Sequence, residues 1–283
     1  MSDDTSTHQH KRRVAPDKVA EADAGAQSSA ALPPAGRASN GQGDVFAPIG
    51  EAAHLVARLD IGRAARKGIP EVVLADAKSD EQVIAIVRAL LASSGCALVS
   101  RLRPATLDHL THEFVETGAA VADVRRQAHA MALHAPGYVR PQTGGHIGVL
   151  TAGVSDIPVA EEARLVAEEM GCHVASLYDV GVAGLHRLLG PLQTLLTDGV
   201  AALVVCAGMD GALPSVVAGL SPVPVIGVPT SIGYGAGGKG HAALLAMLQT
   251  CSPGLTVVNI DNGVGAGATA ALIANQIAAA RSG

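Results

Sequence analysis

The sequence predicts an α/β protein whose C-terminal half is a doubly wound parallel sheet covered by helices. From residue 146 onward, short apolar segments alternate with longer amphipathic segments, the pattern of successive parallel βαβ units. Hydrophobic residues make up 48% of the 283-residue chain, but aromatic residues only 2%. The core must therefore be built from Ala, Val, Leu and Ile, which suits strands that helices bury on both faces.

Composition excludes several classes of protein. The formal net charge of −5 argues against a nucleic-acid binder, which should carry a basic excess. The four cysteines lie far apart and form no C-x-x-C pair, so neither a zinc knuckle nor a disulfide framework is expected. No long apolar run is free of Gly, Pro and charge, and the basic N-terminus precedes no apolar segment, so we expect neither a membrane partner nor a secretory signal. These features together predict a cytoplasmic protein.

The N-terminal part of the chain divides into an arm and a small domain. Residues 1–44 are rich in Ser, Ala, Gly and Pro and show no apolar period, which predicts a disordered arm. Residues 45–144 predict a small α/β domain that ends in a Gly/Pro-rich linker. Its elements are expected as a helix over 51–70, a strand over 71–76, a helix over 79–95, a strand over 97–102, a helix opened by Pro104, and one strand within 125–134. Ser79 and Gln82 have the spacing of a capping box.

Residues 145–283 predict the doubly wound domain. Strands are expected over 146–153, 173–179, 201–208, 223–229 and 255–261. Helices are expected over 159–171, 183–199, 212–220, 239–251 and 267–283. Five strands in this alternation predict a flavodoxin-like sheet, in which ligands bind at the carboxyl ends of the strands.

Each of these strands is followed by a Gly-rich loop. The loops cover residues 151–156, 178–187, 206–215, 228–240 and 259–267. Glycine lets backbone N–H groups approach a ligand closely, and helix N-termini favour phosphate. Five such loops at one sheet edge predict a nucleotide site, although tight turns alone would also require glycine.

Two side chains in these loops have alternative roles. Arg187 follows a Gly-rich loop at a helix start, where it suits either bidentate phosphate contact or a surface ion pair. Asp156 could cap the following helix or accept hydrogen bonds from ribose hydroxyls. The candidate substrate-binding positions are Gly153, Ser155, Asp156, Asp179, His186, Arg187, Gly208, Met209, Ser231, Gly233 and Tyr234.

Two further patterns were weighed as ligand sites. Residues 233–240 approximate the phosphate-binding G-x-x-x-x-G-K-[ST] loop, but Gly240 replaces the hydroxyl residue that binds Mg²⁺. Lys239 then either meets a phosphate or is a solvated loop residue. His8 and His10 are expected to lie in a solvated tail, and His109 and His112 lack a third ligand, so we expect no metal site at either pair.

Six segments carry a resemblance to a known family. TAGVSDIPVAEEA, DVGVAGLHRLL, AGMDGALPSVVAGL, VPTSIGYGA, ALLAML and VVNIDNG closely resemble the LarB family, which makes pyridinium-3,5-biscarboxylate mononucleotide for a nickel-pincer cofactor. That domain is related to the aminoimidazole ribonucleotide carboxylases, PurE. The resemblance extends from residue 145 to the C-terminus, and residues 59–73 with Lys78, Glu81 and Gln82 also look like the family. The arm before Val45 lies outside it.

The resemblance assigns roles to individual residues. Cys251 stands in the loop that carries the family's nucleophile, whereas Cys96, Cys172 and Cys206 are expected as buried small hydrophobes. Asp210 occupies a position where the family usually has Glu, so its acid–base type is kept. Ala212 stands where the ribonucleotide carboxylases carry His in A-G-x-x-x-H-L-P-G.

The resemblance therefore implies an enzyme that carboxylates the pyridinium ring of nicotinate adenine dinucleotide with CO₂ and hydrolyses its phosphoanhydride. The products would be pyridinium-3,5-biscarboxylate mononucleotide and AMP, formed through a covalent cysteine adduct. Mg²⁺ could neutralise the pyrophosphate, and no tightly bound organic cofactor is implied. A homo-oligomer, an octamer by analogy, is expected. The alternatives are a ribonucleotide carboxylase or mutase, a nucleotide-dependent kinase or ATPase, and a non-catalytic nucleotide-binding subunit.

Overall fold

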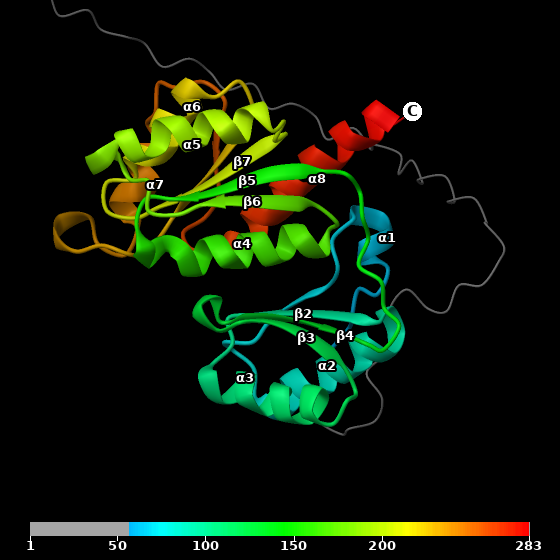
Figure 1. Ribbon diagram of the computed structural model, residues 1–283. Helices are drawn as coiled ribbons and strands as arrows, with labels where there is room; N and C mark the ends of the chain where they lie inside the picture. Colours follow the sequence, from blue (N-terminus) through cyan, green and yellow to red (C-terminus); the bar gives the residue numbers. More distant parts are fainter. Residues whose placement is uncertain (1–56, 283) are drawn as a thin grey trace, which may run out of the picture. The chain divides into compact units, whose positions relative to one another are not determined.

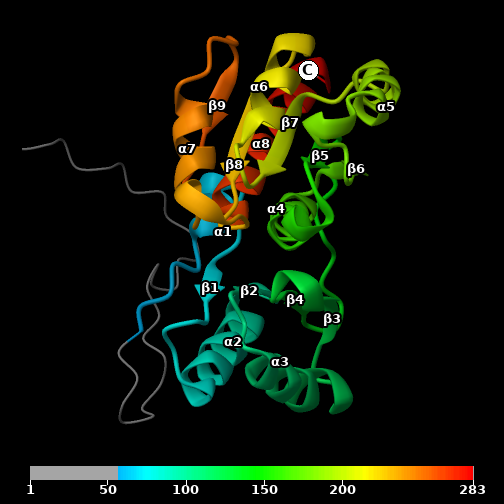
Figure 2. The ribbon, with the colours of Figure 1, turned by 90° about the vertical axis from the view of Figure 1, so that its left-hand side faces the viewer.

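The computed structural model describes residues 57–282. The predicted arm, residues 1–44, and the start of the predicted small domain, residues 45–56, lie outside the described residues. The described chain forms two sheets, one of four strands in the order β1-β2-β4-β3 and one of five strands in the order β6-β5-β7-β8-β9 (Figures 1 and 2).

The five-stranded sheet has the predicted doubly wound topology. Its strands are β5 (His146–Thr151), β6 (His173–Leu177), β7 (Ala202–Ala207), β8 (Val225–Pro229) and β9 (Leu255–Val257). All neighbouring strands are parallel. The chain first adds β6 on one side of β5 and then continues on the other side from β7. This confirms the predicted fold class and places the topological switch point between β5 and β7.

Helices cover both faces of this sheet (Figure 1). One face carries α4 (Ile157–Glu169) and α8 (Gly263–Ser282), and the other carries α5 (His186–Thr197), α6 (Ala212–Leu220) and α7 (His241–Leu248). Alternate side chains of each strand enter the two cores: Val204 packs with α4 and α8, whereas Leu203 and Val205 pack with α5, α6 and α7. The strands are apolar throughout because both faces are buried.

The four-stranded sheet belongs to the N-terminal part of the described chain. Its strands are β1 (Val72–Leu74), β2 (Cys96–Ser100), β3 (Val121–Arg125) and β4 (Ala130–His134), and its helices are α1 (Arg63–Lys67), α2 (Asp80–Ser94) and α3 (Pro104–Leu110). A π-helical segment, Thr111–Glu116, follows α3. The predicted capping box is confirmed, because Ser79 Oγ accepts from Gln82 N at 3.3 Å and Gln82 Oε1 accepts from Ser79 N at 3.1 Å.

One prediction for this region was wrong, and one strand was missed. Within the described part of the helix expected over 51–70, only α1 is helical, and Gly68 ends it in the left-handed conformation (φ 71°). The strand expected within 125–134 is confirmed as β4, but the sequence did not predict β3, which ends at Arg125 and pairs antiparallel with β4. β3 lies at the sheet edge and contains Asp123 and Arg125 among its five residues. Its polar composition hides the apolar pattern on which strand prediction depends.

α8 begins at Gly263 and not at Gly267, as the sequence had suggested. A Cβ at Gly263 would lie 2.5 Å from the Val159 carbonyl oxygen, and one at Gly267 would lie 2.2 Å from that of Ala163. These glycines therefore let α8 approach the backbone of α4, so part of the Gly-rich segment 259–267 serves helix packing.

Contrary to the expectation that no segment could span a bilayer, α8 is long and apolar enough by composition, although Ala266, Ala270, Ala271 and Ala274 on it are buried in the core.

α4 lies between the two sheets (Figure 1). Leu98 of β2 and Ala130 and Ala132 of β4 share a core with residues of α4 and β5. Four carboxylates of α4 face this region, at positions Glu161, Glu162, Glu168 and Glu169. Each has a partner from the N-terminal part: Arg125 contacts Glu161 and Glu168, Ser100 donates to Glu162, and Arg140 pairs with Glu169.

Arg125 supplies a matched test of these interactions. Its side chain is 16% exposed and also binds Asp123, with Nε 2.7 Å from Oδ1. Replacing Arg125 by Ala leaves several half-buried carboxylates without their cation, so we expect a loss of about 2–4 kcal/mol in unfolding free energy, measured by urea titration. Arg126→Ala is the control, because Arg126 and its partner Asp108 are more than half exposed, and it should cost under about 1 kcal/mol. Equal losses in the two variants would contradict this account.

Candidate active site

The loops at the carboxyl edge of the five-stranded sheet are joined by hydrogen bonds. Thr230 Oγ1, after β8, donates to Asp156 Oδ1 at 2.6 Å, which connects that loop to the one after β5. Met209 N, after β7, donates to the Ile232 carbonyl oxygen at 3.0 Å. Ser231 N donates to Asp261 Oδ1, after β9, at 2.8 Å. Loops from four different strands thus form one connected surface at this edge.

Four of these loops hold a non-glycine residue in the left-handed region. They are Asp179 (φ 58°), Met209 (φ 49°), Lys239 (φ 60°) and Asp261 (φ 54°), which follow β6, β7, β8 and β9. Such conformations are uncommon for residues other than glycine. They cost on the order of 1–3 kcal/mol each and concentrate at functional sites. The backbone therefore marks the edge at which the sequence placed the nucleotide site.

Asp156 is 4% exposed, and the protein occupies both of its carboxylate oxygens. Oδ1 accepts from Thr230, and Oδ2 accepts from Gly153 N at 2.9 Å. Burial raises the pKa of Asp156 above its ordinary value, while these hydrogen bonds oppose the shift. Asp156 stands directly before α4, but its side chain makes no capping hydrogen bond to that helix, so the predicted helix-capping role is wrong. The carboxylate instead holds the backbone of the preceding loop through Gly153 N.

Gly208 is required by packing at this edge. A Cβ there would lie 2.2 Å from the Ile232 carbonyl oxygen and 2.8 Å from Thr230 Oγ1. Any larger residue would push apart the loops after β7 and β8. Gly208 thus brings Met209 next to Ile232 and Gly233, whatever contact it makes with a substrate.

Arg187 and Asp179 form an ion pair with Nη1 2.7 Å from Oδ2. The structure thus shows the ion-pair alternative for Arg187. Both side chains are more than one third exposed, so a phosphate could still reach the guanidinium. Neighbouring His186 opens α5 and is also exposed.

The remaining candidates at this edge are exposed. They are Ser155, Met209, Asp210, Ser231, Gly233 and Tyr234. Asp210 Oδ1 accepts from Ala212 N at 3.3 Å, at the N-terminal end of α6. Tyr234 is 82% exposed, and Met209 and Ile232 are also exposed. Apolar side chains gathered on a surface in this way favour contact with a ligand or another chain.

Cys251 does not join these residues within one chain. It precedes β9, at the amino edge of the sheet, where α7 has ended. A Cβ at Gly219, near the end of α6, would lie 3.4 Å from Ser252 Oγ, whereas Asp210 precedes the start of α6. Since α6 has nine residues, its length alone separates the two ends by about 13 Å.

The other three cysteines are buried, as expected, and only Cys251 is exposed. Burial raises the pKa of Cys172 to about 11, and burial together with the charge of Glu169 raises the pKa of Cys96 to about 12. Complete burial also raises the pKa of Cys206. Because the thiolate is the nucleophile, Cys251 alone has the accessibility that covalent chemistry needs.

Sequence reasoning missed a cleft of about 510 Å³ beside the carboxyl edge. Arg101 and His129 of the N-terminal part line it together with Pro158, Glu162 and Asp261. Arg101 (φ 56°) and His129 (φ 51°) are again left-handed. No sequence signal could have located this cleft, because its walls come from four distant segments of the chain.

The edge offers no ready cage for Mg²⁺. Asp179 is paired with Arg187, both oxygens of Asp156 are engaged, and Asp261 accepts from Ser231. Within residues 57–282, the one group of three or more ligand side chains that converge is Cys96, His134 and Glu169. His109 and His112 are exposed and pair with Asp80 and Glu116, whereas His8 and His10 lie outside the described residues.

Comparison with known proteins divides the chain in the same way as its sheets. The family model of AIR carboxylase matches residues 146–283, and that of the LarB/PurE-like N-terminal domain matches residues 51–134. An uncharacterized protein of Methanocaldococcus jannaschii is 42% identical over 77% of this chain and 83% of its own length. N5-carboxyaminoimidazole ribonucleotide mutases of Methanocaldococcus jannaschii and Pyrococcus abyssi are 32% and 31% identical, over 47% and 46% of this chain and 78% and 72% of their own lengths.

Substitution of Thr230 tests the buried hydrogen bond from its hydroxyl to Asp156. Because burial raises the folded pKa of Asp156 above the ordinary 3.8, its ionisation lowers stability as pH rises through that folded pKa. Thr230→Val removes the donated hydrogen bond and should lower unfolding free energy by about 1–3 kcal/mol near neutral pH. The loss should shrink in acid, where Asp156 is protonated.

Thr230→Ser keeps the hydroxyl and is the control. Chemical denaturation of both variants across the acidic and neutral range measures the effect. A pH-independent loss in Thr230→Val would show that only packing was disturbed.

Proposed function

This chain belongs to the LarB family, whose C-terminal domain is PurE-like, and we propose its function on that basis. Its chemistry is accordingly of the PurE-related carboxylase type. Within that type, we assign to it the carboxylation of nicotinate adenine dinucleotide by CO₂. Hydrolysis of the phosphoanhydride then yields pyridinium-3,5-biscarboxylate mononucleotide and AMP.

The observation that carries this proposal is Ala212. It is the first residue of α6, at the carboxyl edge beside Asp210. In the motif of the ribonucleotide carboxylases this position is His, which can move a proton, whereas a methyl group cannot. The sheet is therefore kept while the proton-transfer group of the purine reaction is absent.

The cleft beside this edge supports a larger substrate. The mutases are similar over less than half of this chain, whereas the wall formed by Arg101 and His129 belongs to the LarB-type N-terminal domain. A volume of about 510 Å³ is within the range of small-molecule sites. We assign it to the adenylate half of the dinucleotide, with Arg101 available to phosphate.

The covalent chemistry can be written with balanced atoms. The thiolate of Cys251 adds to the ring carbon para to the pyridinium nitrogen, which gives a neutral dihydropyridine. The adjacent enamine carbon, meta to nitrogen, then forms a bond to CO₂. Loss of the proton from that carbon and expulsion of the thiolate restore the aromatic ring. Water supplies the atoms for the separate cleavage of the phosphoanhydride.

Asp210 and Arg187 are the side chains that we assign to the remaining steps. Asp210 is exposed at a helix N-terminus, where it can accept the ring proton or orient the hydrolytic water. Arg187 can leave Asp179 for the pyrophosphate. Any Mg²⁺ would come with the pyrophosphate, because the edge supplies no preformed set of ligands.

A second copy of the chain would complete the site. Cys251 and Asp210 lie at opposite edges of one sheet, so a single chain cannot present both to one ring. Leu189, Leu220, Leu245 and Leu248 are exposed on the outer helices, and a groove of about 450 Å³ between α5 and α6 adjoins the Cys251 loop. Such apolar surface favours a homo-oligomer; an octamer is proposed by analogy alone.

The similarity to N5-carboxyaminoimidazole ribonucleotide mutases favours a second candidate, the interconversion of carboxylated aminoimidazole ribonucleotides. Incubation with nicotinate adenine dinucleotide and bicarbonate, followed by mass spectrometry, distinguishes the two. If the chain carboxylates the dinucleotide, we expect to detect pyridinium-3,5-biscarboxylate mononucleotide and AMP as products. Turnover of the ribonucleotide with an unchanged dinucleotide would instead establish the mutase, and a dinucleotide that is bound but unchanged would indicate a non-catalytic subunit.

Cys251→Ser should abolish carboxylation and leave folding and dinucleotide binding nearly intact. A serine hydroxyl lacks the accessible anion that a thiol provides near neutral pH. Intact-protein mass spectrometry with dinucleotide and no CO₂ should show an adduct in the wild type and none in the variant. Cys172→Ser is the control, because that thiol is buried. Full carboxylation by Cys251→Ser would exclude the covalent route.

Complementation tests whether two copies share a site. Cys251→Ser and Asp210→Asn, each inactive alone, should regain activity when co-expressed with different tags and purified as a mixed assembly. Such an assembly contains sites with both wild-type side chains only if they come from different chains. Mixed assemblies that stay inactive would place Cys251 and Asp210 in the same chain's site.

A further inference from the structure

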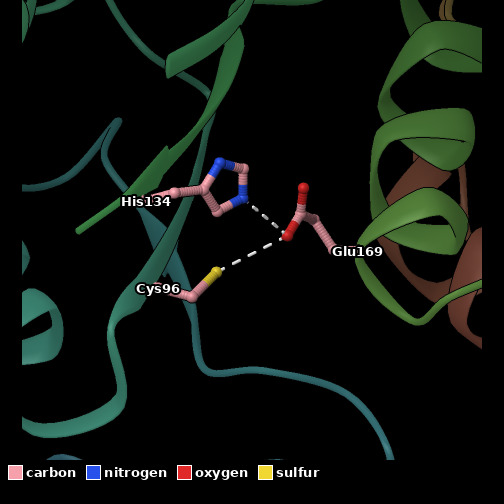
Figure 3. Close-up of side chains that lie close together, drawn as sticks. All are labelled: Cys96, His134 and Glu169. Atoms are coloured by element: carbon pink, nitrogen blue, oxygen red, sulfur yellow. Dashed lines mark hydrogen bonds and ion pairs between the residues drawn. The ribbon is translucent and has the colours of Figure 1, made fainter. Parts of the chain in front are cut away.

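Three side chains converge at the end of α4 opposite the carboxyl edge (Figure 3). Cys96 is the first residue of β2, His134 is the last residue of β4, and Glu169 is the last residue of α4. Cys96 and His134 are directly paired across the antiparallel strands, which brings their side chains to the same place. Glu169 approaches them from the other sheet's helix.

The distances match those between the ligands of one small cation. Glu169 Oε2 lies 3.0 Å from His134 Nε2 and 3.5 Å from Cys96 Sγ, and all three atoms lie within 4.8 Å of one another. Tetrahedral Zn²⁺ with its ordinary bond lengths separates nitrogen from oxygen by about 3.3 Å and sulfur from oxygen by about 3.6 Å. Two of the three edges of such a site are thus already formed.

Neighbouring groups hold these ligands in place. The side chain of Glu169 is fully buried, and that of His134 is 15% exposed. Arg140 pairs with Oε1 of Glu169, so Oε2 is left to face the thiol and the imidazole. The ring of Tyr138 stacks on that of His134, with centroids 5.1 Å apart and planes at 4°. Such outer contacts orient metal ligands in proteins.

We propose that Cys96, His134 and Glu169 bind one divalent transition-metal ion of the zinc class, with water at the fourth position. A thiolate, an imidazole and a carboxylate are the ligand types that Zn²⁺ prefers. On binding, Cys96 loses its proton to solvent and the neutral imidazole of His134 donates its Nε2 lone pair. The thiolate and Glu169 neutralise the dication, while Asp123, 3.7 Å from Arg140, balances the remaining positive charge.

The ion would join the two halves of the protein. Cys96 and His134 belong to the segment matched by the LarB-type N-terminal model, and Glu169 belongs to the segment matched by the AIR carboxylase model. The site lies at the opposite end of α4 from the loop of Asp156. Its role is therefore a structural clip between the domains, distinct from the carboxylation chemistry.

Cobalt titration of the chelator-treated full chain tests the proposal. We expect one equivalent of Co²⁺ per chain, a thiolate-to-cobalt charge-transfer absorption, and displacement of Co²⁺ by Zn²⁺. Cys96→Ser should lose this absorption. Its affinity for Co²⁺ should also fall by more than roughly 10–100-fold, the loss caused by removing a residue that only supports a metal ligand. Two control variants should retain the absorption and the affinity for Co²⁺. They are Cys251→Ser, which removes the exposed thiol, and His109→Gln, which removes a surface imidazole.

The wild-type chain also decides the question if Cys96→Ser fails to fold. X-ray absorption of the zinc-loaded wild type should show one sulfur among nitrogen and oxygen ligands, and Zn²⁺ should raise the melting temperature by mass action. A wild type that takes up no stoichiometric metal overturns the proposal. The proposal is also overturned if zinc has no sulfur ligand, or if the cobalt absorption is lost in Cys251→Ser and kept in Cys96→Ser.

Discussion

The burial of α4 between two sheets is the constraint on which the rest of the described structure depends. One helix carries four carboxylates into a region walled by both sheets. A charge buried there without a partner would cost several kcal/mol. The N-terminal part of the chain supplies those partners through Arg125, Arg140 and Ser100. The N-terminal sheet is thus a required component of the fold around α4.

α4 also sets the positions of two chemically different regions. Its N-terminal end follows the loop that Asp156 caps and forms one wall of the cleft, through Pro158 and Glu162. Its C-terminal end carries Glu169 to Cys96 and His134. The helix is 13 residues long, so it separates the two regions by about 20 Å. Reaction chemistry and domain attachment can therefore vary independently.

The sheet that this protein shares with the ribonucleotide mutases explains how one fold can support different carboxyl transfers. The strands and their hydrogen-bonded loops fix a binding edge, and the chemistry depends on the few side chains displayed there. In the proposed function, Ala212 leaves no proton-transfer group at the start of α6, and Arg101 and His129 line a cleft beside the edge that receives the larger substrate. That proposal requires no change in the sheet.

The sequence by itself determined the features that local patterns encode: the doubly wound sheet, the capping box of Ser79 and Gln82, and the burial of Cys96, Cys172 and Cys206. Only the tertiary structure decided that Asp156 is satisfied by Thr230, that Cys96 meets His134 and Glu169, and that Cys251 lies at the opposite edge from Asp210. Strand alternation and helix caps depend on residues a few positions apart. These other arrangements relate segments dozens of residues apart, so they depend on strand order and helix packing, which no local pattern records.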